Sequence, residues 1–168
     1  MRSWESRSAE QANLLNPAFV GVVCWNAVKE YRRTINAEVP YPVPFIITPL
    51  VLHKKTRSSL PSSIRTTFTS WVSSPEGMQS KIDFAARATS LVPVVKETIL
   101  FSIAHELISI TTDGFFNIGA KSVQSSVIKS QGFSDEVIAC INSAAFCGRW
   151  LARSGKIETI MALLGVKP

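Results

Sequence analysis

The side chains that most often carry chemistry in proteins are few and scattered in this chain. Its only histidines are His53 and His105, and its cysteines are Cys24, Cys140 and Cys147. A metal site needs several His, Cys, Asp or Glu residues at ligand spacing, and the sequence has no such pattern. It also has no P-loop, no G-x-G-x-x-G loop and no G-x-S-x-G nucleophile motif. The sequence therefore predicts a non-enzymatic protein with no catalytic residue, no metal and no cofactor.

Positive charge is the clearest polar feature of the sequence. The chain carries 18 Lys and Arg against 12 Asp and Glu, and its densest run of cations is the segment HKKTR at residues 53–57. A net charge of +6 fits a polyanionic neighbour such as DNA. We predict that Lys54, Lys55, Arg57 and Arg65 form a DNA contact. The alternative, a solvated loop without a ligand, is equally compatible with a charge run.

The C-terminal stretch FCGRWLARSGKIETIMALLGVKP, residues 146–168, combines arginine with aromatic residues. Arg and Trp are enriched at the hot spots of protein interfaces. We predict a partner-binding surface made of Phe146, Arg149, Trp150 and Arg153. The alternative is that Trp150 packs in the domain's own core beside solvated arginines. The inward stripe of this helix is expected to contain small residues that allow close packing: Val137, Ile141, Ala144, Gly148 and Leu151.

Two local signals define the elements of the first third of the chain. Asn16 followed by Pro17 is an N-cap with proline at the first helical position, which predicts a buried helix over residues 17–35. Five prolines between residues 40 and 61 then exclude one continuous helix. We expect an extended connector there, in which residues 45–52 form either a short strand or a helical turn.

The middle of the chain predicts three helices and a hairpin. Apolar spacing favours helices over residues 64–72 and 78–91, and a third begins at Pro93 and runs to about residue 106. Asp113-Gly114 between apolar residues is the strongest hairpin signal in the sequence. Three helices followed by a two-stranded hairpin is the order of a winged helix-turn-helix. The fold prediction is thus mainly α, with a winged-helix-like core of three helices plus a β-hairpin and with flanking N- and C-terminal helices.

The predicted helix before the hairpin is a poor DNA reader. Its segment PVVKETILFSIAHEL has one Lys against two Glu, and residues 59–110 carry four basic and four acidic side chains. Phosphate contacts need Lys and Arg. We therefore interpret the winged-helix-like unit as a protein-docking module.

The chain is expected to form a single domain over residues 1–168. Its parts would be a flexible N-terminus at 1–15, an N-terminal helix and Pro-rich basic connector at 16–58, the winged-helix-like core at 59–120, and C-terminal helices at 132–168. The last part has Ser134 as a helix N-cap, with Gly155 and Gly165 as helix ends.

Composition points to partners and to a compartment. The chain is 46% hydrophobic and only 18% charged, which suggests apolar surface that partners cover. Its apolar runs are too short or too charged for a membrane span. Three cysteines without C-x-x-C spacing and no signal peptide predict a cytoplasmic protein.

Three stretches resemble a known family. FIITPLVLHKKTRSSLP, FAARATSLVPVVKETILF and AAFCGRWLARSGKIETIMALLGVKP are similar to the middle component of three-component ABC-ATPase systems, which include the small accessory subunit of Lamassu anti-phage defence. The similarity runs from Asn16 to Pro168, and the closing G-R-W-x-A…G-V-K-P pattern is its most specific part. Cys147 departs from the larger apolar residue expected beside Gly148.

The resemblance implies a function that the residues alone do not. It implies an accessory subunit that joins an SMC- or Rad50-like ATPase to an effector, commonly a nuclease, and that helps hold the effector inactive until foreign DNA is sensed. DNA would then be contacted through the complex, and no catalytic residue carries over from the family. The main alternative is a free-standing winged-helix transcription regulator, and a weaker one is a toxin or antitoxin of an unrelated two-gene system.

Overall fold

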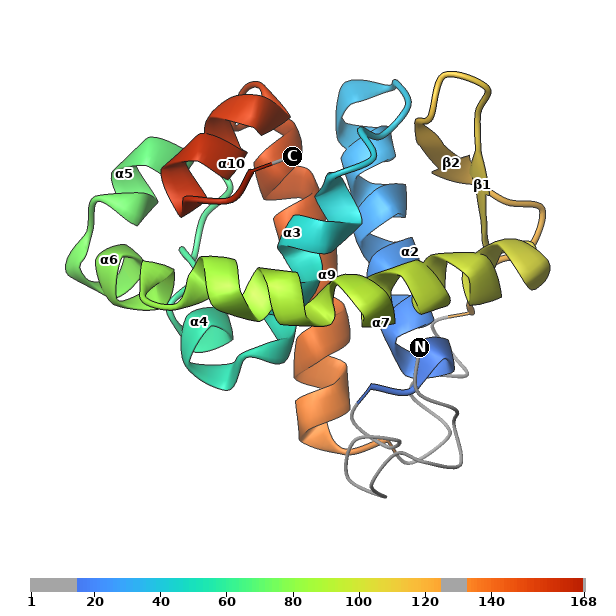
Figure 1. The fold of residues 1–168 in the computed structure, drawn as a ribbon, viewed down its shortest axis with the longest axis horizontal. Helices are drawn as coiled ribbons and strands as arrows, with labels where there is room; N and C mark the ends of the chain where they lie inside the picture. Colours follow the sequence, from blue (N-terminus) through green and yellow to red (C-terminus); the bar gives the residue numbers. More distant parts are fainter. Residues whose placement is uncertain (1–14, 125–132, 168) are drawn as a thin grey trace.

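The described residues form a mainly helical structure with one small hairpin, which confirms the predicted fold class. The computed structural model describes residues 15–124 and 133–167. The N-terminus predicted to be flexible, residues 1–15, lies outside this range except for Leu15. The described elements, with the labels of Figure 1, are α2 Pro17–Ile35, α3 Val43–Leu52, α4 Lys54–Ser58, α5 Phe68–Val72, α6 Pro75–Lys81, α7 Phe84–Ala104, β1 Ile108–Ile110, β2 Phe116–Ile118, α9 Asp135–Ala152 and α10 Ile157–Leu164.

The first described helix, α2, begins and ends where the sequence predicts. The Asn16 side chain accepts a hydrogen bond from the Ala18 amide at 2.8 Å, and Pro17 needs no donor partner in the first turn. Asn36 ends the helix in the left-handed conformation, with φ of 52°. Most of α2 is buried, which agrees with the apolar residues that surround its first turns.

The proline-rich segment after α2 forms two helices, so the expectation of an extended connector is wrong, whereas the helical alternative left open for residues 45–52 is confirmed. Residues 43–52 form α3, and only His53, with φ of −84° and ψ of 108°, separates it from α4. Pro44 lies in the first turn, where its missing N–H costs nothing, whereas Pro49 removes one intrahelical bond. Ile47 and Leu50 are at most 1% exposed. Burial of such side chains offsets the lost bond, since each contributes about 1.5–3 kcal/mol.

The predicted helices of the middle segment are divided differently in the structure. Ser74 caps α6 by accepting from the Gly77 amide, and Asp83, with φ of 56°, separates α6 from α7. Pro93, expected to begin a new helix, lies inside the 21-residue α7. The helix continues through it because Val95 and Ile99 on the next turns are buried. The predicted break between residues 91 and 93 is therefore wrong.

The hairpin forms where Asp113-Gly114 predicts it. Strands β1 and β2 pair antiparallel, with Ile108 opposite Ile118, and Gly114 adopts φ of 81° in the turn. An isolated bridge joins Val39 to Phe116, which ties the segment before α3 to β2. The order α5, α6, α7, β1, β2 is the three-helix and hairpin order expected for a winged-helix-like core.

One hydrophobic core joins elements from both ends of the described chain. The helices α2 and α9 lie side by side, and α7 crosses in front of them in Figure 1. Gly148 makes this approach possible, because a Cβ at that position would lie 2.4 Å from the Ala27 carbonyl oxygen. The predicted role of small residues on the inward stripe of α9 is thus confirmed. None of the described helices is both long and apolar enough to cross a membrane.

Candidate docking groove and basic surface

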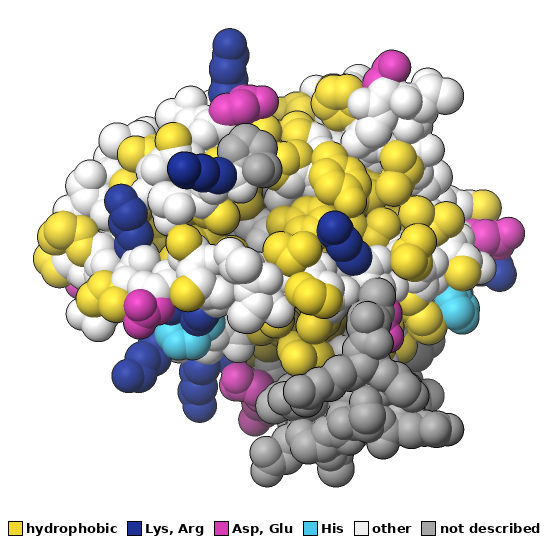
Figure 2. All heavy atoms as spheres, viewed as in Figure 1, with side chains coloured by type: hydrophobic (Ala, Val, Ile, Leu, Met, Phe, Trp, Pro, Cys, Tyr) yellow, Lys and Arg dark blue, Asp and Glu magenta, His cyan; other side chains and the backbone are white. Residues whose placement is uncertain are grey.

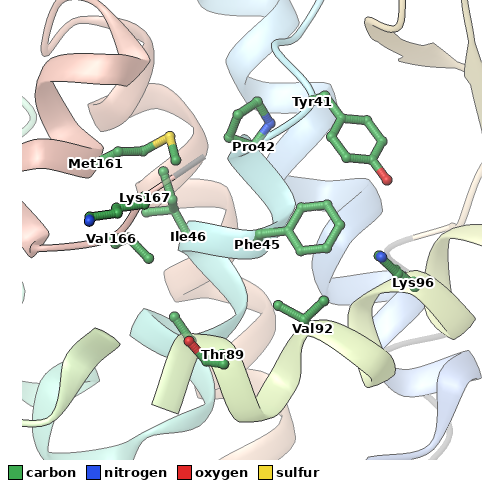
Figure 3. Close-up of a pocket in the computed structure, with 11 residues that line it drawn as sticks. Tyr41, Pro42, Phe45, Ile46, Thr89, Val92, Lys96, Met161, Val166 and Lys167 are labelled. Carbon is green, nitrogen blue, oxygen red and sulfur yellow. The ribbon is translucent and has the colours of Figure 1, made fainter. Parts of the chain in front are cut away.

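An apolar groove lies between α3, α7 and the C-terminal part of the chain formed by α10 and the residues after it. Its volume is about 300 Å³. Figure 3 shows Phe45 of α3 in its middle, with Tyr41 above and Val92 of α7 below. Met161 and Val166 close its other end. The groove therefore combines three segments that are far apart in the sequence.

Aromatic packing holds the α3 wall of the groove in place. The Tyr41 ring lies 5.2 Å from Phe45 and is stacked on Phe116 at a centroid distance of 5.2 Å and an angle of 15°. Phe116 is 0% exposed, whereas Tyr41 is 42% exposed. The bridge between Val39 and Phe116 fixes the backbone beside it. Tyr41 is thus an exposed ring on a rigid support, a side chain type common at interfaces.

The α7 wall continues beyond the groove as an exposed apolar face. Thr89, Val92 and Lys96 line the groove, and Leu100 and Ile103 follow at the i+4 and i+3 spacing that keeps them on the same side of the helix. Leu100 is 65% exposed and Ile103 is 37% exposed. Figure 2 shows hydrophobic side chains gathered over the middle of this face and towards the hairpin.

The hairpin also exposes apolar side chains. Ile110 and Phe115 are 41% and 39% exposed on either side of the turn that contains Gly114, and the strand register places them on opposite faces of the hairpin. Large apolar side chains exposed together, rather than singly, mark interaction sites. We define this surface, the groove together with Leu100 and Ile103 of α7, as the groove face.

Charge at the groove is of one sign. Lys96 and Lys167 line it and lie at opposite ends of it in Figure 3. Among the described residues that line the groove, no side chain is a carboxylate. The groove therefore offers an apolar floor with a positive charge at each end.

A polar pocket of about 340 Å³ lies on another part of the surface, between α4 and α6. His53 caps α4 through its Nδ1 atom, which accepts from the Thr56 amide at 3.3 Å. Burial lowers the pKa of His53, and the neighbouring cations Arg87, Lys55 and Arg57 lower it further. Arg87 itself donates to the Ser80 and Ile82 carbonyl oxygens, at 2.8 and 2.7 Å. The pocket lining combines the cations Lys55 and Arg87 with the carboxylates Glu76 and Asp83.

The structure separates the four predicted DNA-binding residues. Lys54 and Lys55 are exposed on α4, and Arg65 is exposed before α5. Arg57 is only 8% exposed. Its guanidinium donates to the Val51 carbonyl oxygen at 2.5 Å and forms an ion pair with Glu136 of α9.

Arg57 is therefore a structural residue, and its inclusion in a DNA-binding surface is corrected. Its Nη1 also contacts the Cys140 sulfur at 3.2 Å, so the side chain connects α4 to α9. Lys54, Lys55 and Arg65 keep the exposure that a phosphate contact requires, and their role stays a prediction.

The structure also separates the four predicted partner-binding residues. Trp150 is 0% exposed, and its ring packs against Phe68 and Trp71 at 5.0 and 5.3 Å. Its indole N–H donates to the Thr66 carbonyl oxygen at 2.6 Å. Trp150 therefore belongs to the domain's own core, which is the alternative that the sequence left open. It lies there because α9 is covered on two sides, by α2 and by the α5 region.

The other three residues of that predicted surface differ from one another. Arg149 is partly exposed and forms an ion pair with Glu30 of α2 at 3.0 Å. Phe146 is half-buried beside Trp150, at a ring distance of 6.0 Å, and Arg153 is exposed. The structure does not join them into one exposed patch around Trp150, and their partner role stays a prediction.

The sequence did not identify the groove. A signal for its α7 wall was present, since Val92, Lys96, Leu100 and Ile103 share one side of a continuous helix. Interpreting Pro93 as a helix start split that pattern. The α3 wall could not be recognised because the sequence left residues 45–52 open between a short strand and a helical turn.

The cysteines are buried and show no reactive character. Burial raises the pKa of Cys24 to about 11 and that of Cys147 to about 12. Both thiols are therefore protonated near neutral pH. Within residues 15–124 and 133–167, no group of three or more His, Cys, Asp or Glu side chains could hold a metal ion.

Comparison with known protein families identifies the family of the chain. The model of the family described as ABC-three component (ABC-3C) system Middle Component 3 matches residues 4–168. No curated protein and no solved structure matches the chain.

Proposed function

This chain belongs to the family of middle components of ABC-three component systems, and from that premise we propose that it is a non-enzymatic accessory subunit. In this role it bridges an SMC- or Rad50-like ATPase and an effector, a nuclease or another enzyme, in a bacterial defence complex of the Lamassu type. It helps to hold the effector inactive until phage or plasmid DNA is sensed. The complex acts in the cytoplasm.

The observation that carries this proposal is the extent of the family match. It covers residues 4–168, which include every described element from α2 to α10. The whole described fold is therefore the family's unit. A subunit that works by holding partners needs surface for them, and the groove face provides exposed apolar side chains of that kind.

The exposed cations on α4 support an indirect role in DNA sensing. Lys54 and Lys55 project from one short helix, and Lys and Arg side chains supply the phosphate contacts of DNA-binding surfaces. We propose that these two residues, with Arg65, lie along the DNA path of the assembled complex.

That role predicts a salt-dependent loss of DNA binding. The double variant Lys54→Glu with Lys55→Glu should weaken DNA binding by the whole complex. The negative slope of the logarithm of the association constant against the logarithm of the salt concentration should become less steep by about 2, one unit per lost phosphate contact. Fluorescence anisotropy with duplex DNA at several salt concentrations measures this. Unchanged affinity at low salt would remove α4 from the DNA path.

The free-standing regulator is the rival function, and the face of α7 weighs against it. In a winged helix, the helix before the hairpin reads the major groove. Here that helix presents Val92, Leu100 and Ile103 around a single Lys96. Such a surface suits an apolar partner better than phosphates and base edges.

Co-expression with the two neighbouring genes tests the proposed function. A tag on this chain should recover a large coiled-coil ATPase and an effector in one peak on size-exclusion chromatography. The regulator would instead be recovered alone and would bind one promoter sequence tightly. Recovery of the chain alone would contradict the proposal.

A further inference from the structure

We propose that the groove face binds an amphipathic helix with acidic side chains, contributed by a partner subunit of the complex. This inference rests on the proposed function and adds the place and the chemistry of one contact. The occupant would insert apolar side chains beside Phe45 and Val92, and would place carboxylates near Lys96 and Lys167 (Figure 3).

The length of the surface suits a helix. From Thr89 to Ile103, α7 advances by 14 residues, which is about 21 Å at a rise of about 1.5 Å per residue. A partner helix of about four turns would cover that length. Its apolar residues would recur at i, i+3, i+4 and i+7, the pattern of a helix that lies in a groove.

The backbone of the walls favours a helical occupant over an extended one. The main walls are α3 and α7, whose amides are bonded within the helices. Pro49 and Pro93 remove the usual amide donors of the Phe45 and Thr89 carbonyls, so only a few backbone groups are available to a ligand. An extended peptide would bury unpaired N–H groups there, whereas a helix satisfies its own.

The lining also fits a protein segment better than a small polar ligand. A small-molecule site needs several convergent polar groups to fix orientation. The polar side chains at this groove are few: the Thr89 hydroxyl already donates to the Ala85 carbonyl oxygen at 2.9 Å, Tyr41 contributes one hydroxyl, and the two lysines lie at the ends. Apolar contact along a length is what the groove face offers.

The two lysines of the groove favour a partner helix with acidic side chains. Lys96 and Lys167 are exposed and stand beside apolar surface. Acidic residues on the rim of the occupant would therefore meet opposite charges at both ends. A second copy of this chain is disfavoured, because a two-fold contact would bring together two groove linings that each have lysines and no carboxylate, in a chain of net charge +6.

The test is a charge reversal in the co-expressed complex. The variant Lys96→Glu with Lys167→Glu should weaken partner binding by about tenfold, because each exposed charge pair contributes a small favourable energy that the reversal turns into repulsion. The control is Lys54→Glu with Lys55→Glu, which makes the same change of charge away from the groove. It should assemble normally in the absence of DNA.

Photo-crosslinking identifies the occupant. A photoreactive amino acid at Val92 should capture a peptide of the ATPase or effector subunit with an apolar stripe and Asp or Glu at its edges. Reversing those acidic residues to lysine should restore binding to the Lys96→Glu, Lys167→Glu variant. Circular dichroism of each variant confirms that the fold is unchanged.

The outcomes separate the two proposals. If the unmodified chain recovers no partner, the proposed function fails. If the complex forms but the lysine reversal binds as tightly as the control, the groove inference alone fails. Capture of a second copy, of residues 1–14 of this chain, or of a partner segment without acidic residues would also overturn it.

Discussion

The core around Trp150 and the groove face use similar residue types in opposite ways. Around Trp150, the rings of Phe68 and Trp71 enclose a tryptophan that is 0% exposed and whose N–H is bonded to the Thr66 carbonyl oxygen. On the groove face, Tyr41 and Leu100 are 42% and 65% exposed. An aromatic and basic sequence therefore does not mark an interface by itself. What matters is whether the fold covers those side chains.

The cations of the molecule differ in the same way, since two arginines are paired within the fold and two lysines stand at the groove. Arg57 and Arg149 each form an ion pair that connects α9 to another helix, with Glu136 in one case and Glu30 in the other. Lys96 and Lys167 instead stand at the open groove. Cations near α9 stabilise the fold, whereas cations at the groove are available to a partner.

Truncating Trp150 should have the largest effect on stability. Replacing Trp150 by Ala leaves a large cavity and an unpaired Thr66 carbonyl, so we expect a loss of about 3–5 kcal/mol of unfolding free energy. Chemical denaturation followed by circular dichroism measures it. The matched variant on the groove face, Leu100→Ser, should change the value by no more than about 0.5 kcal/mol. Equal losses of unfolding free energy for the two variants would contradict the assignment of Trp150 to the core and of Leu100 to an exposed face.

Removing the Arg57 guanidinium should have an intermediate effect. The Arg57→Ala variant leaves the buried Val51 carbonyl with the weak Cys140 thiol donor at 3.8 Å in place of the guanidinium, and it leaves Glu136, which is half-exposed, without its ion pair. We expect a loss of about 1–3 kcal/mol. Lys55→Ala on the same helix is the control and should be nearly neutral. If Arg57→Ala were as mild as Lys55→Ala, Arg57 would return to the surface cluster.

Titration of His53 should have the smallest effect. Its pKa lies below the ordinary value of 6.5, because of burial first and then of Arg87, Lys55 and Arg57. The unfolded chain therefore binds this proton more readily than the folded one. The contribution of His53 is fully present above about pH 6.5 and is lost as the pH falls below that value towards the lower pKa of the folded state.

The His53→Asn variant tests this sign, because Asn retains an acceptor for the cap of α4. The unfolding free energy of the unmodified chain, measured at about pH 7.5 and about pH 5.5, should fall more on acidification than that of the variant. A larger fall in the variant would mean that the cations around His53 do not act as described.

Local signals predicted much of the fold, and long-range packing decided the rest. Asn16-Pro17, Asp113-Gly114, Ser134 and Gly165 each act through hydrogen bonds or backbone angles within a few residues, and the elements that they predict are present. Pro93 is a local signal too, but α7 continues through it because its next turns are buried. Propensity gives way where burial on the far side of the helix outweighs one lost hydrogen bond.

The functional surface was less predictable than the fold for a physical reason. Trp150 and Arg57 were assigned to binding surfaces for two reasons. The sequence does not show that the segment before α5 covers Trp150, and it does not show that Arg57 of α4 reaches α9. The groove was missed because Phe45, Val92 and Met161 come together only in the folded chain. Family membership, in contrast, depends on the sequence along the whole length.

Hydrogen–deuterium exchange of this chain, alone and in the co-expressed complex, tests the central claim most directly. If a partner helix covers the groove face, exchange should slow in the segments 41–46, 89–103 and 161–167, which contain the groove lining and its continuation along α7. The buried surroundings of Trp150 should change little. Slower exchange confined to other surfaces, with those three segments unchanged, would show that no partner helix covers the groove face.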